Sequence, residues 1–399
     1  MNVHVLRSHH STGTLPAVAD TAIARVEIVE DMGAAEPRWR VLEAGQSLMT
    51  PYQRFDFLSA WQRHVGAPAG VTPFIVIGLS AQGAPLFLWP FGRRRFGGLR
   101  LIEFLGGKHA NFNMGLWRPE VASAIEADDM RALLARISSR ADLMTLTNQP
   151  LTWGGTTNPF ALLPHQRAPN YGYSGHLIPD YDALLRARTN SATRKKMRKK
   201  ERALASYGAV RFEEPREPAD LRRVLDVFFK QKSARMRHVG IPDAFAPPGV
   251  RRFIEAAATE HAPGAMPPIE LFALRVDDIV VATYGGIVAG GRFCAMFNSI
   301  IKDRYAAESP GEQLLTRLVR HCCERGLDSF DLGIGESNYK GLFCDDAEPL
   351  FDSYFPLASA GRLLGFAFSS AARVKRAIKG HAPLWSLVRA LRRLRARFV

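Results

Sequence analysis

A short strand, then a helix, then paired strands: this order occurs twice in the chain. Residues 24–31 alternate apolar and polar side chains, as a half-buried strand does, and residues 55–65 place apolar side chains on one helical face. Residues 72–79 and 85–94 follow as a predicted hairpin. The same order restarts at residues 209–215 without repeating the residue identities, so we interpret it as a duplication of architecture.

The length of 399 residues fits this duplication, because a single hydrophobic core stops growing at about 250 to 300 residues. Hydrophobic residues make up 47% and charged residues 23%, which excludes a disordered chain. We therefore predict an α/β protein with a mixed α+β sheet in two tandem lobes, residues 24–185 and 207–358. Residues 1–23 lack an apolar signal region and are predicted to be a disordered leader.

The net charge of +15 is concentrated in two segments. Residues 186–202 hold nine Lys or Arg and one acid, and residues 353–399 hold ten and no acid, which leaves the remainder close to neutral. The first segment predicts a basic linker helix over residues 186–206, with Asn190, Ser191 or Thr193 as cap. The second predicts a basic amphipathic helical tail over residues 359–399, either lying on an anionic membrane surface or packed on the second lobe.

The second half continues with three predicted strands, at residues 269–276, 279–288 and 291–300. Residues 309–326 then combine a Ser-Pro-Gly start with apolar side chains at three- and four-residue spacing, which predicts a helix. A further strand is expected at residues 329–335. Residues 148–170 are rich in Pro and Asn and are expected to be irregular.

The basic segment, the Ser-Pro-Gly turn and the sequence FDLGIGESNYKGLF occur in an order that resembles the GNAT acyltransferases. More narrowly, they resemble the CelD/FemAB-like branch, in which GNAT lobes are duplicated. The resemblance covers residues 24–355. It implies an acyltransferase with an acyl-donor site in the second lobe, using acetyl-CoA or another acyl-CoA as co-substrate.

The implied donor site lies at the start of the helix over residues 309–326. A helix N-terminus offers unpaired amides and a partial positive charge to the donor's phosphates. Ser309 is the expected N-cap, Pro310 the first helical residue and Gly311 the point where phosphate approaches, with backbone amides from Glu312 and Gln313. Asn298 and Ser299 complete the predicted donor site. The usual GNAT turn has two glycines where this chain has only Gly311, which leaves an aminoacyl-tRNA donor open.

The resemblance also assigns catalytic roles after the last predicted strand. By position, Tyr339 becomes the acid that protonates the leaving thiolate, and Lys340 the group that stabilises the developing oxyanion. Glu336 and Asp331 are candidates for the base or for orienting the acceptor. Asp331 also fits a turn-bonding role.

The acceptor is expected to be an amine or hydroxyl of a cell-envelope or exopolysaccharide precursor. His109, Asn111 and Asn113 are candidates for lining its pocket. On the basic helix, Arg194, Lys195 and Arg198 are predicted to meet an anion, whether donor phosphates, an anionic glycan precursor or tRNA.

Two other functions remain open from the sequence. One is aminoacyl-tRNA-dependent transfer, although the chain has no dedicated RNA-binding module; the other is a non-catalytic adaptor for membranes or nucleic acid. The four cysteines lack the spacing of a zinc site, so no metal is expected. We expect a cytoplasmic protein, with peripheral attachment at the inner membrane face left open.

Overall fold

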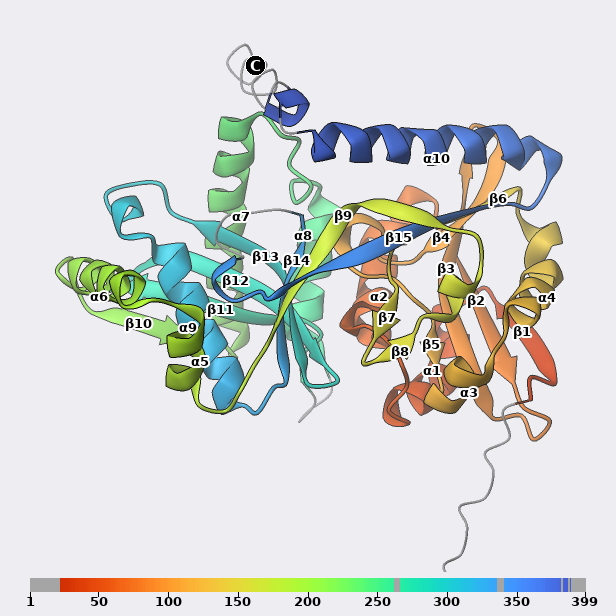
Figure 1. Cartoon of the computed structure of the whole chain (residues 1–399), viewed down its shortest axis with the longest axis horizontal. Coiled ribbons are helices and arrows are strands. Elements are labelled where there is room, and N and C mark those ends of the chain that lie inside the picture. Colours follow the sequence, from red (N-terminus) through yellow and green to blue (C-terminus); the bar gives the residue numbers. More distant parts are fainter. Residues whose placement is uncertain (1–21, 262–265, 336–340, 382, 387, 389–399) are drawn as a thin grey trace, which may run out of the picture.

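One mixed sheet runs through the whole molecule in the computed structural model (Figure 1). The structure describes residues 22–261, 266–335, 341–381, 383–386 and 388. Thirteen strands form the sheet in the order β1-β2-β3-β4-β6-β15-β9-β14-β13-β12-β11-β10, with β5 paired to β3. The predicted mixed α/β fold is confirmed.

The first lobe supplies one end of this sheet. Its strands are β1 (Arg25–Val29), β2 (Thr72–Leu79), β3 (Pro85–Phe96), β4 (Leu99–Phe104), β5 (Leu116–Trp117) and β6 (Leu143–Pro150), with a small β7 (Thr152–Trp153) and β8 (Thr156–Thr157) hairpin beside them. Its helices are α1 (Met32–Ala44), α2 (Phe55–Trp61), α3 (Pro119–Ala124) and α4 (Ala127–Ile137). The predicted hairpin forms, because β2 and β3 pair antiparallel along their length.

The second lobe supplies the other end. Its strands are β10 (Val210–Glu213), β11 (Glu270–Val276), β12 (Ile279–Ala289), β13 (Arg292–Ile300) and β14 (Ser329–Ile334). Its helices are α5 (Tyr181–Arg188), α6 (Ser191–Ala205), α7 (Pro218–Val239), α8 (Pro248–Thr259) and α9 (Pro310–Glu324). Helix α9 carries the chain back across the sheet, so that β13 and β14 run parallel.

The two lobes exchange strands. Strand β9 (Gln166–His176) precedes α5 in sequence but pairs with β14, and β15 (Asp346–Pro356) follows β14 but pairs with β6. The two exchanged strands also pair with each other, antiparallel. The sheet is therefore not divided at the boundaries expected from the sequence. The expected irregularity of residues 148–170 is also corrected, since β9 begins at Gln166.

The basic segment forms two helices where one was expected. Helix α5 ends at Arg188 and α6 begins at Ser191, with the Asn190 side chain accepting the Thr193 amide at 2.8 Å. That side chain satisfies an amide that the first turn of the helix leaves unpaired. Helix α6 packs against α9 within the second lobe.

Helix α10 (Ser359–Gly380) forms the described part of the tail and crosses β6, β9 and β15 (Figure 1). Gly361 and Gly365 let it approach β6 closely, because a Cβ on Gly361 would lie 1.8 Å from the Asp142 carbonyl oxygen. The predicted leader falls mostly on residues 1–21 and the last part of the tail on 389–399, both outside the described residues. None of the helices that the structure describes is long and apolar enough to cross a membrane.

Candidate active site

Strands β13 and β14 separate near the middle of the sheet. They pair in parallel only from Arg292 to Cys294 of β13, opposite Ser329 to Asp331 of β14. Strand β13 then continues to Ile300 without β14 as its neighbour. A crevice at the carboxyl ends of parallel strands is where open α/β sheets bind ligands.

Asn111 of the first lobe reaches the point of separation. Its Nδ2 donates to the Ala295 carbonyl of β13 at 3.2 Å and to the Tyr52 hydroxyl at 2.9 Å. Gly333 of β14 has a φ of 71°, and a Cβ there would lie 2.7 Å from the same Nδ2. Asn111 thus joins the two lobes at this opening.

Helix α9 begins beside the end of β13, and the amides of its first turn are partly paired. Ser309 has a φ of 53°, so its side chain does not cap the helix as expected. Instead its carbonyl accepts the Glu312 and Gln313 amides at 3.0 and 3.2 Å. Those two amides, expected to face the donor, are therefore already paired.

Packing also requires a glycine at position 311. Gly311 is buried, and a Cβ there would lie 2.4 Å from the Cδ1 atom of Ile300. Pro310 is buried beside it and has no amide hydrogen to satisfy. The turn is thus fixed by contact with the end of β13, in addition to any contact with a ligand.

The comparisons with known proteins identify this arrangement. A family model described as an acetyltransferase (GNAT) domain matches residues 191–341, which include β13, α9 and β14. Residues 191–341 thus match a GNAT domain, and the fold of the chain is similar to that of FemX.

Solved structures resemble most of the chain at low sequence identity. FemX shares 10% identity over 86% of this chain and 100% of its own, with a TM-score of 0.57. The C-terminal domain of a putative lysylphosphatidylglycerol synthetase from Agrobacterium fabrum shares 12% identity over 86% and 96%, with a TM-score of 0.52. A conserved protein of unknown function from Bacteroides thetaiotaomicron VPI-5482 shares 10% over 82% and 99%, with a TM-score of 0.51. No curated protein matches the sequence.

Asp331 lies inside an ion-pair cluster at the point where β13 and β14 still pair. It is fully buried, and Arg292 donates to it at 2.5 Å while also lying 3.2 Å from Glu348 of β15. Burial raises the pKa of Asp331 to about 6, although the charge of Arg292 opposes the shift. The Oδ1 atom of Asp331 also accepts the Gly333 amide, which is the turn-bonding role that the sequence allowed, and Arg292 links Asp331 to Glu348.

The other predicted catalytic residues, Glu336, Tyr339 and Lys340, lie outside the described residues. Of the donor-site residues on β13, Ser299 is buried and bonded to Thr283 and Gln231, both at 2.7 Å. Its side chain is therefore engaged within the core. The Asn298 carbonyl lies on the part of β13 beyond its pairing with β14.

A half-buried lysine that sequence reasoning missed reaches this part of β13. Lys232 of α7 donates to the Asn298 carbonyl at 3.1 Å and lies 5.3 Å from the centre of the Phe245 ring. Burial lowers the pKa of Lys232 to about 8. Its position on an amphipathic helix did not indicate that its side chain contacts β13.

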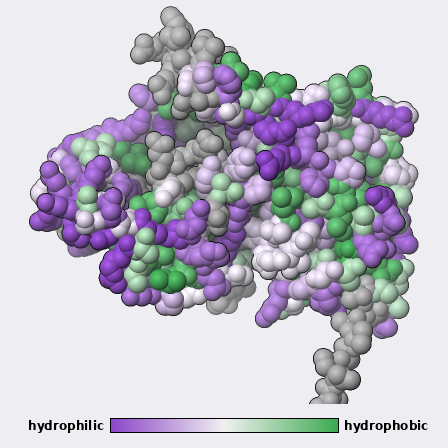
Figure 2. Space-filling model, in the orientation of Figure 1, coloured by the Kyte–Doolittle hydropathy of each residue, from purple (hydrophilic) through white to green (hydrophobic). Residues whose placement is uncertain are grey.

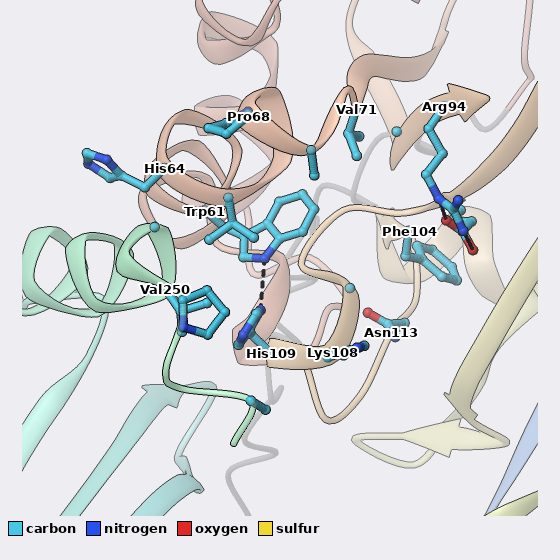
Figure 3. Close-up of a pocket in the computed structure, with 18 of the residues that line it drawn as sticks. Trp61, His64, Pro68, Val71, Arg94, Phe104, Lys108, His109, Asn113 and Val250 are labelled. Carbon is cyan, nitrogen blue, oxygen red and sulfur yellow. Dashed lines mark hydrogen bonds and ion pairs between the residues drawn. The ribbon is translucent and has the colours of Figure 1, made fainter. Parts of the chain in front are cut away.

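A cavity of about 860 Å³ lies between the first lobe and the α7–α8 region of the second (Figure 3). His109 and Asn113 line it, with Trp61, Lys108 and Val250 among their neighbours. The Trp61 indole donates to His109 Nδ1 at 3.1 Å, and burial lowers the pKa of His109, which keeps the ring neutral.

Asn113 carries an unsatisfied polar atom at this cavity. Its Nδ2 donates to the Thr147 carbonyl at 3.0 Å, and its Oδ1 is buried with no hydrogen-bond partner among the described residues. A buried acceptor left unpaired is costly unless a ligand or water fills it. Asn111, grouped with these two residues from the sequence, does not line the cavity.

The basic residues of α6 differ in what they contact. Lys200 donates to the Ser309 hydroxyl at 2.5 Å, so α6 brings a positive charge to the start of α9. Arg194 instead donates to the Thr189 carbonyl, and Lys195 and Arg198 are exposed. In the part of the chain that the structure describes, no group of three His, Cys, Asp or Glu side chains is arranged to hold a metal ion.

Proposed function

We propose that this chain is an N-acyltransferase that moves an acyl group from acyl-CoA to an amine or hydroxyl of a cell-envelope or exopolysaccharide precursor. The separation of β13 from β14 at the start of α9, within the matched GNAT region, is the observation that carries the proposal. An extended, amide-containing donor arm would lie along β13 beyond its pairing with β14, as an added strand lies along the edge of a sheet.

The donor's phosphates would lie at the start of α9, near Lys200. An ammonium beside a helix N-terminus is unfavourable by itself, because both are positive. A bound phosphate lowers the energy of both groups. This supports a donor with an anionic end at this position.

The acceptor would occupy the cavity lined by His109 and Asn113 and attack the acyl carbon directly in a ternary complex. The bond from the acceptor atom to the carbonyl carbon forms, and the carbon–sulfur bond breaks. Tyr339 would give its proton to the leaving thiolate, Lys340 would stabilise the oxyanion, and Glu336 would take the acceptor's proton.

Transfer from aminoacyl-tRNA is the second candidate. The exposed Lys195 and Arg198 on α6 favour it, since a solvated basic surface suits an extended polyanion better than one phosphate group. An adaptor without catalysis is the third, and it predicts no turnover with either donor. For all three candidate functions, we propose that the protein acts in the cytoplasm. The basic tail over residues 359–399, which has no Asp or Glu, would contact the inner membrane face.

Thermal denaturation with separate donors tests these alternatives. Acetyl-CoA, a long-chain acyl-CoA and an aminoacyl-tRNA are each titrated against the purified protein, because a ligand that binds only the folded state raises the melting temperature as its concentration exceeds Kd. Stabilisation by acyl-CoA and not by the matching acyl-pantetheine, which lacks the phosphates and the nucleotide, would support the first candidate. Stabilisation by aminoacyl-tRNA alone would replace it with the second.

A further inference from the structure

Helix α10 presents its large apolar side chains to solvent. Leu363, Phe366 and Val374 are 78%, 66% and 58% exposed, the three highest values among the large hydrophobic residues that the structure describes as exposed. At 100° per residue they fall on one side of the helix. The residues between them on that side, Ala367, Ser370 and Ala377, carry no charge.

The opposite side of α10 fixes the helix to the sheet with small and polar residues. Gly361 and Gly365 pack on Leu143, and the Ser369 hydroxyl donates to the Gln166 side chain at 2.9 Å. Arg376 donates to the Arg167 carbonyl at 2.6 Å. The helix is thus held by one side, and its apolar side remains outward.

The orientation of α10 is opposite to that of a surface helix whose only role is to cover a hydrophobic core. Such a helix turns its large apolar residues inward and its polar residues to water. An apolar stripe on a helix held firmly by its other side needs a partner of its own.

The charges beside the stripe identify that partner. Exposed Arg362 and Arg373 flank it on one side, and Lys375 is also exposed. Residues 353–399 contain no Asp or Glu, so nothing in this segment offsets the positive charge. Figure 2 shows hydrophobic residues beside strongly hydrophilic ones along the upper edge, where α10 runs.

We propose that the outward side of α10, with Leu363, Phe366 and Val374, docks on the surface of an anionic lipid bilayer. A helix lying in the interface buries its apolar side chains at the boundary of the acyl chains, and the basic residues beside them reach the lipid headgroups. Each basic residue near an anionic leaflet adds about 1 kcal/mol, which salt screening reduces.

Docking in this way has a consequence for the cavity. Leu143, under α10, and Thr145, in the cavity wall, are two residues apart on β6 and point to the same side of the sheet. The bilayer would therefore lie on the side of the sheet that carries the cavity.

Co-sedimentation of the full chain with vesicles tests the proposal. Vesicles of phosphatidylglycerol and phosphatidylcholine are compared with pure phosphatidylcholine at low and high salt. We expect binding to the anionic vesicles at low salt, which falls as salt rises. The Leu363→Ser/Phe366→Ser variant should bind about tenfold or more weakly, since it removes two apolar side chains from the interface.

The matched control is Ile178→Ser/Ile241→Ser, which changes two residues of 43% and 41% exposure away from α10. Melting temperatures confirm that both variants fold. Unchanged vesicle binding in the α10 variant, or no binding by the full chain at low salt, would overturn the proposal. So would a dimer in solution that the α10 variant abolishes, because the stripe would then be a contact between copies of this chain.

Discussion

The ammonium of Lys200 lies 2.5 Å from the hydroxyl oxygen of Ser309, at the start of α9. Its nearest carboxylate there, Glu312, is 3.9 Å away. The two residues are 109 positions apart in sequence, so the folded chain brings a charge from α6 to a helix end that is itself positive. An anionic ligand at this position would stabilise both.

Replacing Lys200 should therefore weaken binding of the donor. We expect Lys200→Gln to raise the Kd for acyl-CoA roughly three- to tenfold, with a smaller difference at high salt. Isothermal titration at two salt concentrations measures it. Lys196→Gln is the matched control, because Lys196 is an exposed residue of the same helix. An equal loss in both variants would indicate a general charge effect instead of a site.

A substitution at Gly311 should lower the stability of the protein as well as weaken the binding of the donor. A Cβ at this position meets Ile300, so Gly311→Val is expected to cost about 1–3 kcal/mol in free energy of unfolding. Ile300→Ala removes the clashing Cδ1 and Cγ1 atoms. Gly311→Ala should therefore lower the free energy of unfolding less in the Ile300→Ala background than in the wild type, as measured by urea unfolding. Additive costs would contradict the packing explanation.

The Arg292–Asp331 pair should be among the most costly to break. Arg292→Met leaves a buried carboxylate without its partner, which typically destabilises a protein by about 3–5 kcal/mol. Arg95→Met, on an exposed position of β3, should change the free energy of unfolding by less than about 0.5 kcal/mol.

The pH dependence of stability provides a second measure of this pair. The pKa of Asp331 rises from 3.8 to about 6 on folding, so between these values the folded protein binds more protons than the unfolded chain. The contribution of this group to stability therefore falls as pH rises from about 4 to about 6. Asp331→Asn should show a flatter profile over this range in urea unfolding. A profile as steep as that of the wild type would exclude Asp331 as the titrating group.

The sequence predicted those elements whose side chains alternate or recur with a clear period. The hairpin of β2 and β3, the meander of β11 to β13 and helix α9 all carry such patterns. Helix α1 was not predicted, because Pro37 lies inside it and proline usually marks a helix boundary. Strands β9 and β15 were missed because Pro169, Gly172 and Pro349 break the pattern of alternation.

The site was predictable only where a local motif marks it. The Ser-Pro-Gly turn marks the start of α9, and the preceding strand β13 was predicted at residues 291–300. Lys232 and Lys200 were not singled out, since their importance comes from the distant residues Asn298 and Ser309 that folding brings to them. The ion-pair cluster of Asp331 likewise includes Glu348 of β15, a strand that no local sequence pattern predicted.

Tyr339 and Lys340 should affect turnover more than donor affinity. Tyr339→Phe and Lys340→Ala remove groups proposed to act on charge that develops in the transition state, so kcat should fall on the order of a hundredfold with little change in Kd for the donor. Steady-state kinetics with separate binding titrations measures both. Tyr207→Phe is a control on a partly exposed tyrosine remote in sequence from this segment. Wild-type kcat in both variants would remove the two residues from the mechanism.

Asn113 should contribute to binding of the acceptor alone. Its Oδ1 is buried at the cavity without a partner among the described residues, while its Nδ2 is held by Thr147, so the oxygen is positioned to accept a hydrogen bond from a ligand. Asn113→Ala should raise the KM for the acceptor roughly three- to tenfold and leave the Kd for acyl-CoA unchanged, because the donor is proposed to bind between β13 and β14. Asn170→Ala is the matched control, since Asn170 bonds to Lys379 of α10 and does not line the cavity. A thermal scan separates a folding defect from a binding defect, and an acceptor KM unchanged in a stable Asn113→Ala protein would show that the acceptor binds elsewhere.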